Sequence, residues 1–132
     1  MKKLFFTSCL LAAGSVLFAQ ADEAKLRESM KQIGPTCSGL GKKIAAKDAS
    51  SAADAKKLSA WFVDVQKFWK AKKATDGVTF SKAAGMEFKT IAKLTAAGKW
   101  DDAQASFKKA TANCAGCHTA HREKGASGFT IK

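Results

Sequence analysis

The regular spacing of apolar residues between Asp22 and Lys47 is the feature that most constrains the fold. Apolar side chains recur there at steps of three or four residues, which places them on one face of an amphipathic helix. Glycine and proline at Gly34-Pro35 fall inside this stripe, and proline removes a backbone donor, so a kink or a local break is predicted there. The stripe consists of Leu26, Met30, Ile33, Cys37, Leu40 and Ile44.

Three more helices are predicted downstream, because the chain has one proline, no tyrosine and many alanines and lysines. They are expected at about Ser51–Lys73, Thr79–Ala97 and Asp101–Lys124. The residues after Gly125 are predicted to form a short polar tail. Short connections make neighbouring helices antiparallel, so the expected fold is all-α, an up-down-up-down four-helix bundle in a single domain over residues 22–132.

Three local signals are expected to mark the helix ends. Ser51 and Asp54 have the spacing of a capping box at the start of the second helix. The Asp76-Gly77 pair predicts the turn before the third helix. Gly98 is expected to end that helix.

The first 21 residues, Met1–Ala21, have the layout of a secretory signal peptide. Two lysines precede an apolar run that ends in an A-x-A cleavage pattern at Ala19-Gln20-Ala21. The run is shorter than the roughly 20 residues that a membrane span needs. We therefore expect export to the periplasm, a mature chain starting near Asp22 and no stable membrane insertion. Cys9 lies within the run and lacks the upstream leucine of a lipoprotein anchor.

The segment Cys114-Ala115-Gly116-Cys117-His118 is the C-x-x-C-H attachment sequence of c-type haem. On a helix, positions i, i+3 and i+4 project from one side, so two thiols can reach the vinyl groups while the imidazole reaches the iron. Small residues at Ala115 and Gly116 are expected to let the macrocycle approach the backbone. The motif predicts one covalent haem c, with its iron bound by His118.

The same cysteine spacing also occurs in two other kinds of site. A thioredoxin-like redox motif needs a βαβ context, which an all-helical chain lacks. A zinc site would need three thiolates and one imidazole, from Cys37, Cys114, Cys117 and His118, and would recruit Cys37 from another helix. Without such a role Cys37 is expected to be a small buried apolar residue.

The segment Leu94–Lys124 resembles the last helix of the class II c-type cytochromes, the cytochrome c′ and cytochrome c-556 family. In that family the attachment motif lies near the C-terminus, and an aromatic and a basic residue follow the haem histidine at its third and fourth positions. Here those positions hold His121 and Arg122. The resemblance implies that Arg122 contacts a haem propionate or the imidazole; otherwise it is a solvated cation at the end of a helix.

The run Met30-Lys31-Gln32-Ile33-Gly34 is similar to the Met-x-x-Ile-Gly run of the low-spin family members. Arg27 precedes it one residue closer than is usual, and Pro35 is not typical. The resemblance implies that Met30 is the second iron ligand of an electron carrier. If Met30 only fills the core, the iron would be five-coordinate and would bind NO or CO.

A formal net charge of +12 comes from lysines dispersed along the chain. Export argues against nucleic acid as the partner, so an acidic redox protein is the expected one. No Ser-His-Asp arrangement, paired carboxylates or phosphate loop points to an enzyme. The resemblance also allows a homodimer.

Overall fold

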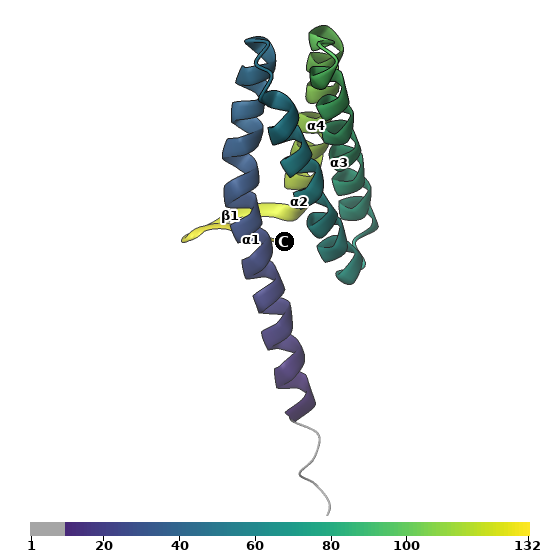
Figure 1. Cartoon of the computed structure of the whole chain (residues 1–132). Coiled ribbons are helices and arrows are strands. Elements are labelled where there is room, and N and C mark those ends of the chain that lie inside the picture. Colours follow the sequence, from purple (N-terminus) through teal and green to yellow (C-terminus); the bar gives the residue numbers. More distant parts are fainter. Residues whose placement is uncertain (1–9) are drawn as a thin grey trace, which may run out of the picture.

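The structure is a computed structural model, which describes the backbone from Leu10 to Lys132 and side chains from Asp22 onward. In Figure 1, α1 and α3 run in one direction and α2 and α4 in the other. The predicted up-down-up-down four-helix bundle is therefore confirmed, with a small hairpin added at its end. The elements are α1 (Leu10–Ala45), α2 (Ser51–Ala71), α3 (Thr75–Ala96), α4 (Trp100–His121), β1 (Arg122–Gly125) and β2 (Gly128–Ile131).

The core is made by one apolar stripe from each helix. Leu40, Leu58 and Phe88 are fully buried at its centre. Helix α2 packs extensively on α3, and α3 on α4, whereas α1 packs more sparsely on α4 than on α2. In the stripe of α1, Met30 and Cys37 are only half-buried. The sparse contact between α1 and α4 therefore leaves part of the predicted core face free to line a site.

Helix α1 continues through Pro35 without interruption. The predicted local break is therefore wrong. Because Pro35 has no amide hydrogen, the carbonyl of Lys31 lacks its helical hydrogen-bond donor. Lys31 and Pro35 are both exposed, so water can satisfy that carbonyl. Buried Ile33 and Leu40 hold the helix to the core on both sides of the proline.

Much of the predicted signal peptide cannot be compared with the structure. Cys9 lies outside the described residues, and between 10 and 21 the structure describes only the helical backbone of α1. Cleavage after Ala21 stays a prediction. In the described part of the chain, no helix has the length and apolar character needed to cross a membrane.

The start of α2 differs from the predicted capping box. The Ser51 hydroxyl donates to the Asp48 carbonyl oxygen at 2.6 Å, and the Asp48 carboxylate accepts from the Ser50 amide at 2.8 Å. Asp54 instead accepts from Lys43 Nζ at 2.6 Å, an ion pair between α2 and α1. That bond raises the pKa of Lys43. The capping prediction was wrong because a cation of α1 competes for the Asp54 carboxylate.

Gly77 does not form a turn, as predicted, but lies in the first turn of α3. The chain reverses earlier, at Lys73, which has a φ of 57°. A Cβ atom on Gly77 would lie 2.6 Å from Cδ2 and 2.7 Å from Cγ of the Trp69 indole. Gly77 is therefore required by the close approach of a buried ring. Gly98, with a φ of 71°, follows α3 as predicted.

We predict that Gly77→Ala lowers the free energy of unfolding by about 1–3 kcal/mol, because the new methyl group overpacks against Trp69. The matched control is Gly39→Ala in α1, where a Cβ would meet nothing within 4 Å. That change is expected to raise stability by about 0.5–1 kcal/mol, through helix propensity. Urea unfolding of both variants measures the difference, and equal effects would contradict the packing role of Gly77.

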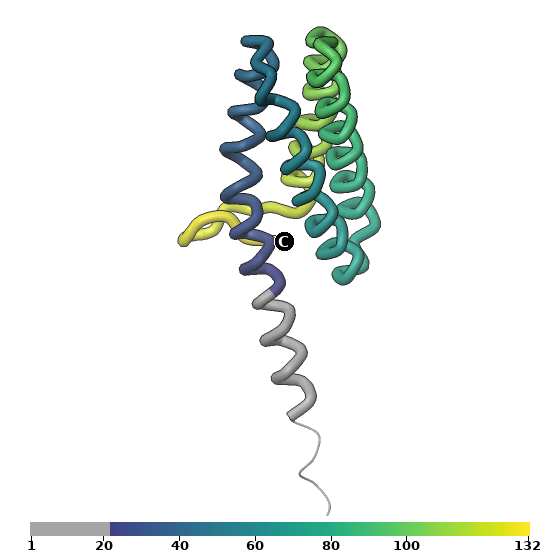
Figure 2. Tube along the Cα trace, viewed as in Figure 1, coloured from purple at the N-terminus to yellow at the C-terminus, as the bar shows by residue number. Residues whose placement is uncertain are grey.

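The C-terminal residues form a hairpin rather than the predicted end of the fourth helix and polar tail. Helix α4 ends at His121, and β1 pairs with β2 in antiparallel register. The Lys132 amide donates to the His121 carbonyl at 3.0 Å, and Ile131 packs against the core. Aromatic and β-branched residues favour this strand. Figure 2 shows the hairpin leaving the end of α4 and extending toward the α1 side of the bundle.

Candidate cofactor site

A cavity of about 870 Å³ lies between α1 and α4, with α2, α3 and the hairpin completing its walls. This volume is within the range of roughly 300–1,000 Å³ that is usual for cofactor sites. The walls are mostly apolar, which favours a ligand with a large apolar surface. They include Leu26, Ile33, Phe62, Val65, Phe80 and Phe107.

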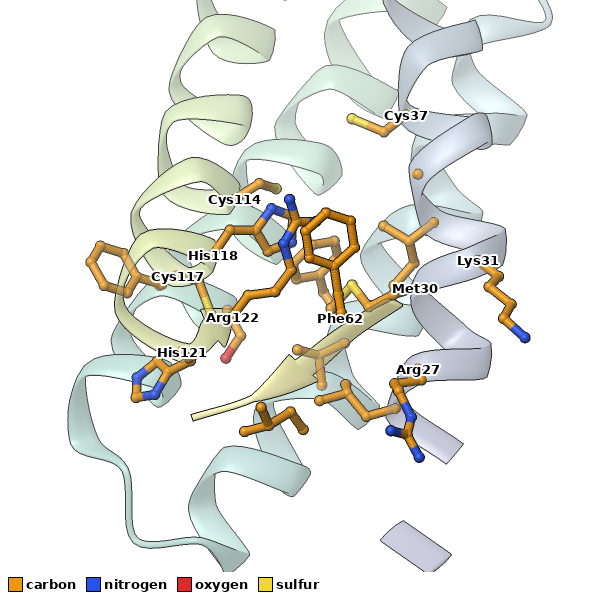
Figure 3. Close-up of a pocket in the computed structure, with 18 of the residues that line it drawn as sticks. Arg27, Met30, Lys31, Cys37, Phe62, Cys114, Cys117, His118, His121 and Arg122 are labelled. Carbon is orange, nitrogen blue, oxygen red and sulfur yellow. The ribbon is translucent and has the colours of Figure 1, made fainter. Parts of the chain in front are cut away.

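The three residues of the attachment motif line this cavity together (Figure 3). Cys114, Cys117 and His118 come from successive turns of α4, where the i, i+3 and i+4 spacing aligns them. Cys117 is buried, and the other two are half-buried. The predicted placement of these side chains on one side of a core-facing helix is thus present in the structure.

Met30 lines the same cavity from the opposite wall. In Figure 3 its side chain extends from α1 toward the side on which α4 carries His118. Met30 is half-buried and packs against the core. Met86, by contrast, is 60% exposed on α3 and does not line the cavity. Of these two methionines, only Met30 lines the cavity that His118 also lines.

The thiols of the site are held in their protonated form. Burial raises the pKa of Cys114 to about 12, with a smaller effect from Cys37. Burial also raises the pKa of Cys117, to about 11, and Asp76 adds to this effect. Redox-active C-x-x-C motifs have lowered thiol pKa values instead. The pair therefore lacks the electrostatics of a dithiol redox centre.

The imidazole of His118 is held in its neutral form. Burial lowers the pKa of His118, and the Arg122 cation adds to this effect. A neutral imidazole keeps the lone pair that a metal ion needs. The surroundings of His118 therefore favour the form of the imidazole that can bind a metal ion.

The four residues of the zinc alternative all line the cavity. Within the part of the chain that the structure describes, however, no group of three or more His, Cys, Asp or Glu side chains could hold a metal ion. Cys37, Cys114 and Cys117 are free thiols. These side chains are thus spread along the walls, which suits an extended cofactor better than a four-coordinate ion.

Gly116 has a packing role that was not predicted. A Cβ atom on this residue would lie 2.6 Å from Cε1 of Phe80, so Gly116 faces α3. Neither Gly116 nor the exposed Ala115 lines the cavity. That these small residues admit a macrocycle therefore stays a prediction. Gly116 allows α4 to approach α3, which positions the flanking cysteines.

His121 packs away from the centre of the cavity (Figure 3). Its ring stacks on Trp69, with the centroids 4.3 Å apart. Its Nε2 lies 3.0 Å from Asp76 Oδ1, at a distance typical of an ion pair but without the alignment of a hydrogen bond. His121 therefore helps to hold the end of α4 against α2 and α3 rather than facing Met30.

Three cationic side chains line the cavity from two elements. Arg122 comes from the start of β1, and its guanidinium carbon lies 3.9 Å from the centroid of the Phe129 ring. Arg27 and Lys31 of α1 also line the cavity. An apolar space with arginines in its walls suits a ligand that combines an apolar body with anionic groups. Phe129 could not be predicted as a cavity residue from the sequence, because the polar composition around it is typical of a tail.

Comparison with known proteins identifies no relative. No family model matches the chain, and neither does any curated protein or solved structure. The chemistry of the site must therefore be inferred from its own residues.

Proposed function

We propose that this protein is an exported c-type cytochrome in which Cys114 and Cys117 hold one haem covalently and His118 binds its iron. One observation carries the proposal: the two thiols and the neutral imidazole open together onto a single apolar cavity. Thioether attachment consumes the two thiols, so their raised pKa values do not conflict with this role.

The walls of the cavity fit a haem in polarity as well as in volume. The apolar side chains suit its ring, and Arg27 and Arg122, which line the cavity, would pair with its carboxylates. The Trp69 indole nitrogen is also buried and has no hydrogen-bond partner among the described residues. A buried donor of this kind is usually satisfied by a carboxylate or an ordered water molecule.

Electron transfer is the activity that these residues support best. When bound, the haem supplies one-electron Fe(III)/Fe(II) chemistry. Met30 would provide a soft thioether opposite His118, and methionine ligation favours a high reduction potential. The apolar walls exclude water, and the helices hold both ligands on rigid elements. The chain thus contributes ligation, orientation and a dry environment.

The partner is proposed to be a redox protein with an acidic surface, met in the periplasm. Without Lys2 and Lys3 of the predicted signal peptide, the 21 remaining basic and 11 acidic residues give the exported chain a formal net charge of +10. This charge and the exposed lysines on all four helices would steer such a partner to the molecule. A homodimer is compatible with the proposal and is not required by it.

Gas binding is the second candidate function, and the packing of Met30 favours it. Met30 contacts the core, as a residue that only fills space would do. If it does not bind the iron, the sixth position would be open to NO or CO. The two candidates therefore share one site and differ in a single ligand.

The absorption spectra of the oxidised and reduced protein test the proposal. We expect low-spin spectra in both states and slow or no reaction of the reduced form with CO. A high-spin ferric spectrum with rapid CO binding would favour the gas-binding candidate. A purified protein without haem absorbance would contradict both.

A further inference from the structure

The C-terminal hairpin forms part of the cavity wall. Its register pairs Arg122 with Ile131 and Lys124 with Phe129, so these four side chains share a face. Three of them, Arg122, Phe129 and Ile131, line the cavity, and Thr130 and the turn residues Ser127 and Gly128 line it as well. In Figures 1 and 3 the strands extend from the end of α4 toward α1. The hairpin thus stands where α1 and α4 pack sparsely on each other.

The hairpin is fixed at its base and not at Phe129. Ile131 packs against the core, and the Lys132 amide donates to the His121 carbonyl at 3.0 Å. Phe129 is 51% exposed and lies outside the core cluster. Its ring contacts the Arg122 guanidinium at 3.9 Å, an arrangement of the cation–π kind. The ring is therefore held at the cavity without supporting the fold.

We propose that the β1–β2 hairpin is the outer wall of the cofactor site and that Phe129 is its contact with the cofactor. This inference rests on the proposed function. Phe129 would cover the cofactor on the open side, Ile131 would anchor the strand, and Arg122 would be kept in the wall of the cavity. Excluding water disfavours the more highly charged ferric state, so the wall would raise the reduction potential.

The test compares Phe129→Ala with the wild type in the full haem-loaded chain. Removing the ring should leave the haem content unchanged, because the proposed attachment is through Cys114 and Cys117 and not through Phe129, and it should leave the helical fold intact, because Phe129 lies outside the core cluster. The midpoint potential should fall, and oxidation of the reduced protein by ferricyanide should become severalfold faster. The matched control is Met86→Ala, an exposed apolar residue that does not line the cavity, and it should match the wild type.

A second variant, Phe129→Leu, separates contact from folding. It keeps an apolar side chain and should restore most of the wild-type potential. If the potential and the oxidation rate of Phe129→Ala equal those of the wild type while haem is retained, the inference is overturned and the proposed function stands. A wild-type protein without attached haem would overturn both.

Discussion

The double variant Cys114→Ala/Cys117→Ala is expected to show no haem stain after denaturing gel electrophoresis, whereas the wild-type band is expected to stain for haem. The physical reason is that only thioether bonds survive denaturation, and these two thiols line the cavity from α4. Each single variant should keep one bond and stain at reduced yield. Haem staining, with total protein as the reference, measures the loss.

The matched control is Cys37→Ala, which removes the third thiol of the same cavity. Cys37 lines the wall from α1 but lies outside the five-residue motif, so this variant should stain like the wild type. If the double variant still stains, attachment through Cys114 and Cys117 is wrong. If Cys37→Ala abolishes the stain, the cysteine of α1 has a role that the proposal does not give it.

Replacement of Met30 by leucine is expected to convert a low-spin protein into a high-spin one that binds CO rapidly in the reduced state. Leucine fills a similar volume, so the fold should lose less than about 1.5 kcal/mol, while the thioether ligand disappears completely. A lower reduction potential is also expected, since the methionine ligand raises it. Absorption spectroscopy with and without CO measures the change of ligand.

Met86→Leu serves as the control, because Met86 is exposed and lies away from the cavity. Its spectrum should equal that of the wild type. A Met30→Leu protein with an unaltered low-spin spectrum would show that Met30 only packs. The sixth ligand would then have to come from another residue.

The helices and their inner faces could be predicted from sequence, because a period of three to four residues reports directly on the buried side of a helix. The shared orientation of Cys114, Cys117 and His118 could be predicted for the same reason. Their i, i+3 and i+4 spacing puts the three side chains on one side of a helix, whatever that helix packs against. That Met30 faces the inside of the bundle could be predicted from the apolar spacing of the first helix. That it lies across from the attachment motif was implied by the family resemblance. That family remains a resemblance, since no known protein matches the chain.

Features that depend on contacts between distant segments could not be predicted in this way. The role of Gly77 is set by the Trp69 ring, which packs on it from α2, whereas its sequence neighbour Asp76 indicated a turn. Asp54 forms an ion pair with Lys43 of α1 rather than a cap. The hairpin was missed because its alternating residues, Phe129 and Ile131, are too few to outweigh the polar composition around them.

The intact mass of the denatured protein, isolated from the cell envelope of an exporting host, tests the central claim most directly. We predict the mass of a chain that starts at Asp22 plus one haem, with iron and no zinc found by elemental analysis. The mass of the unmodified polypeptide alone would contradict covalent haem attachment at Cys114 and Cys117.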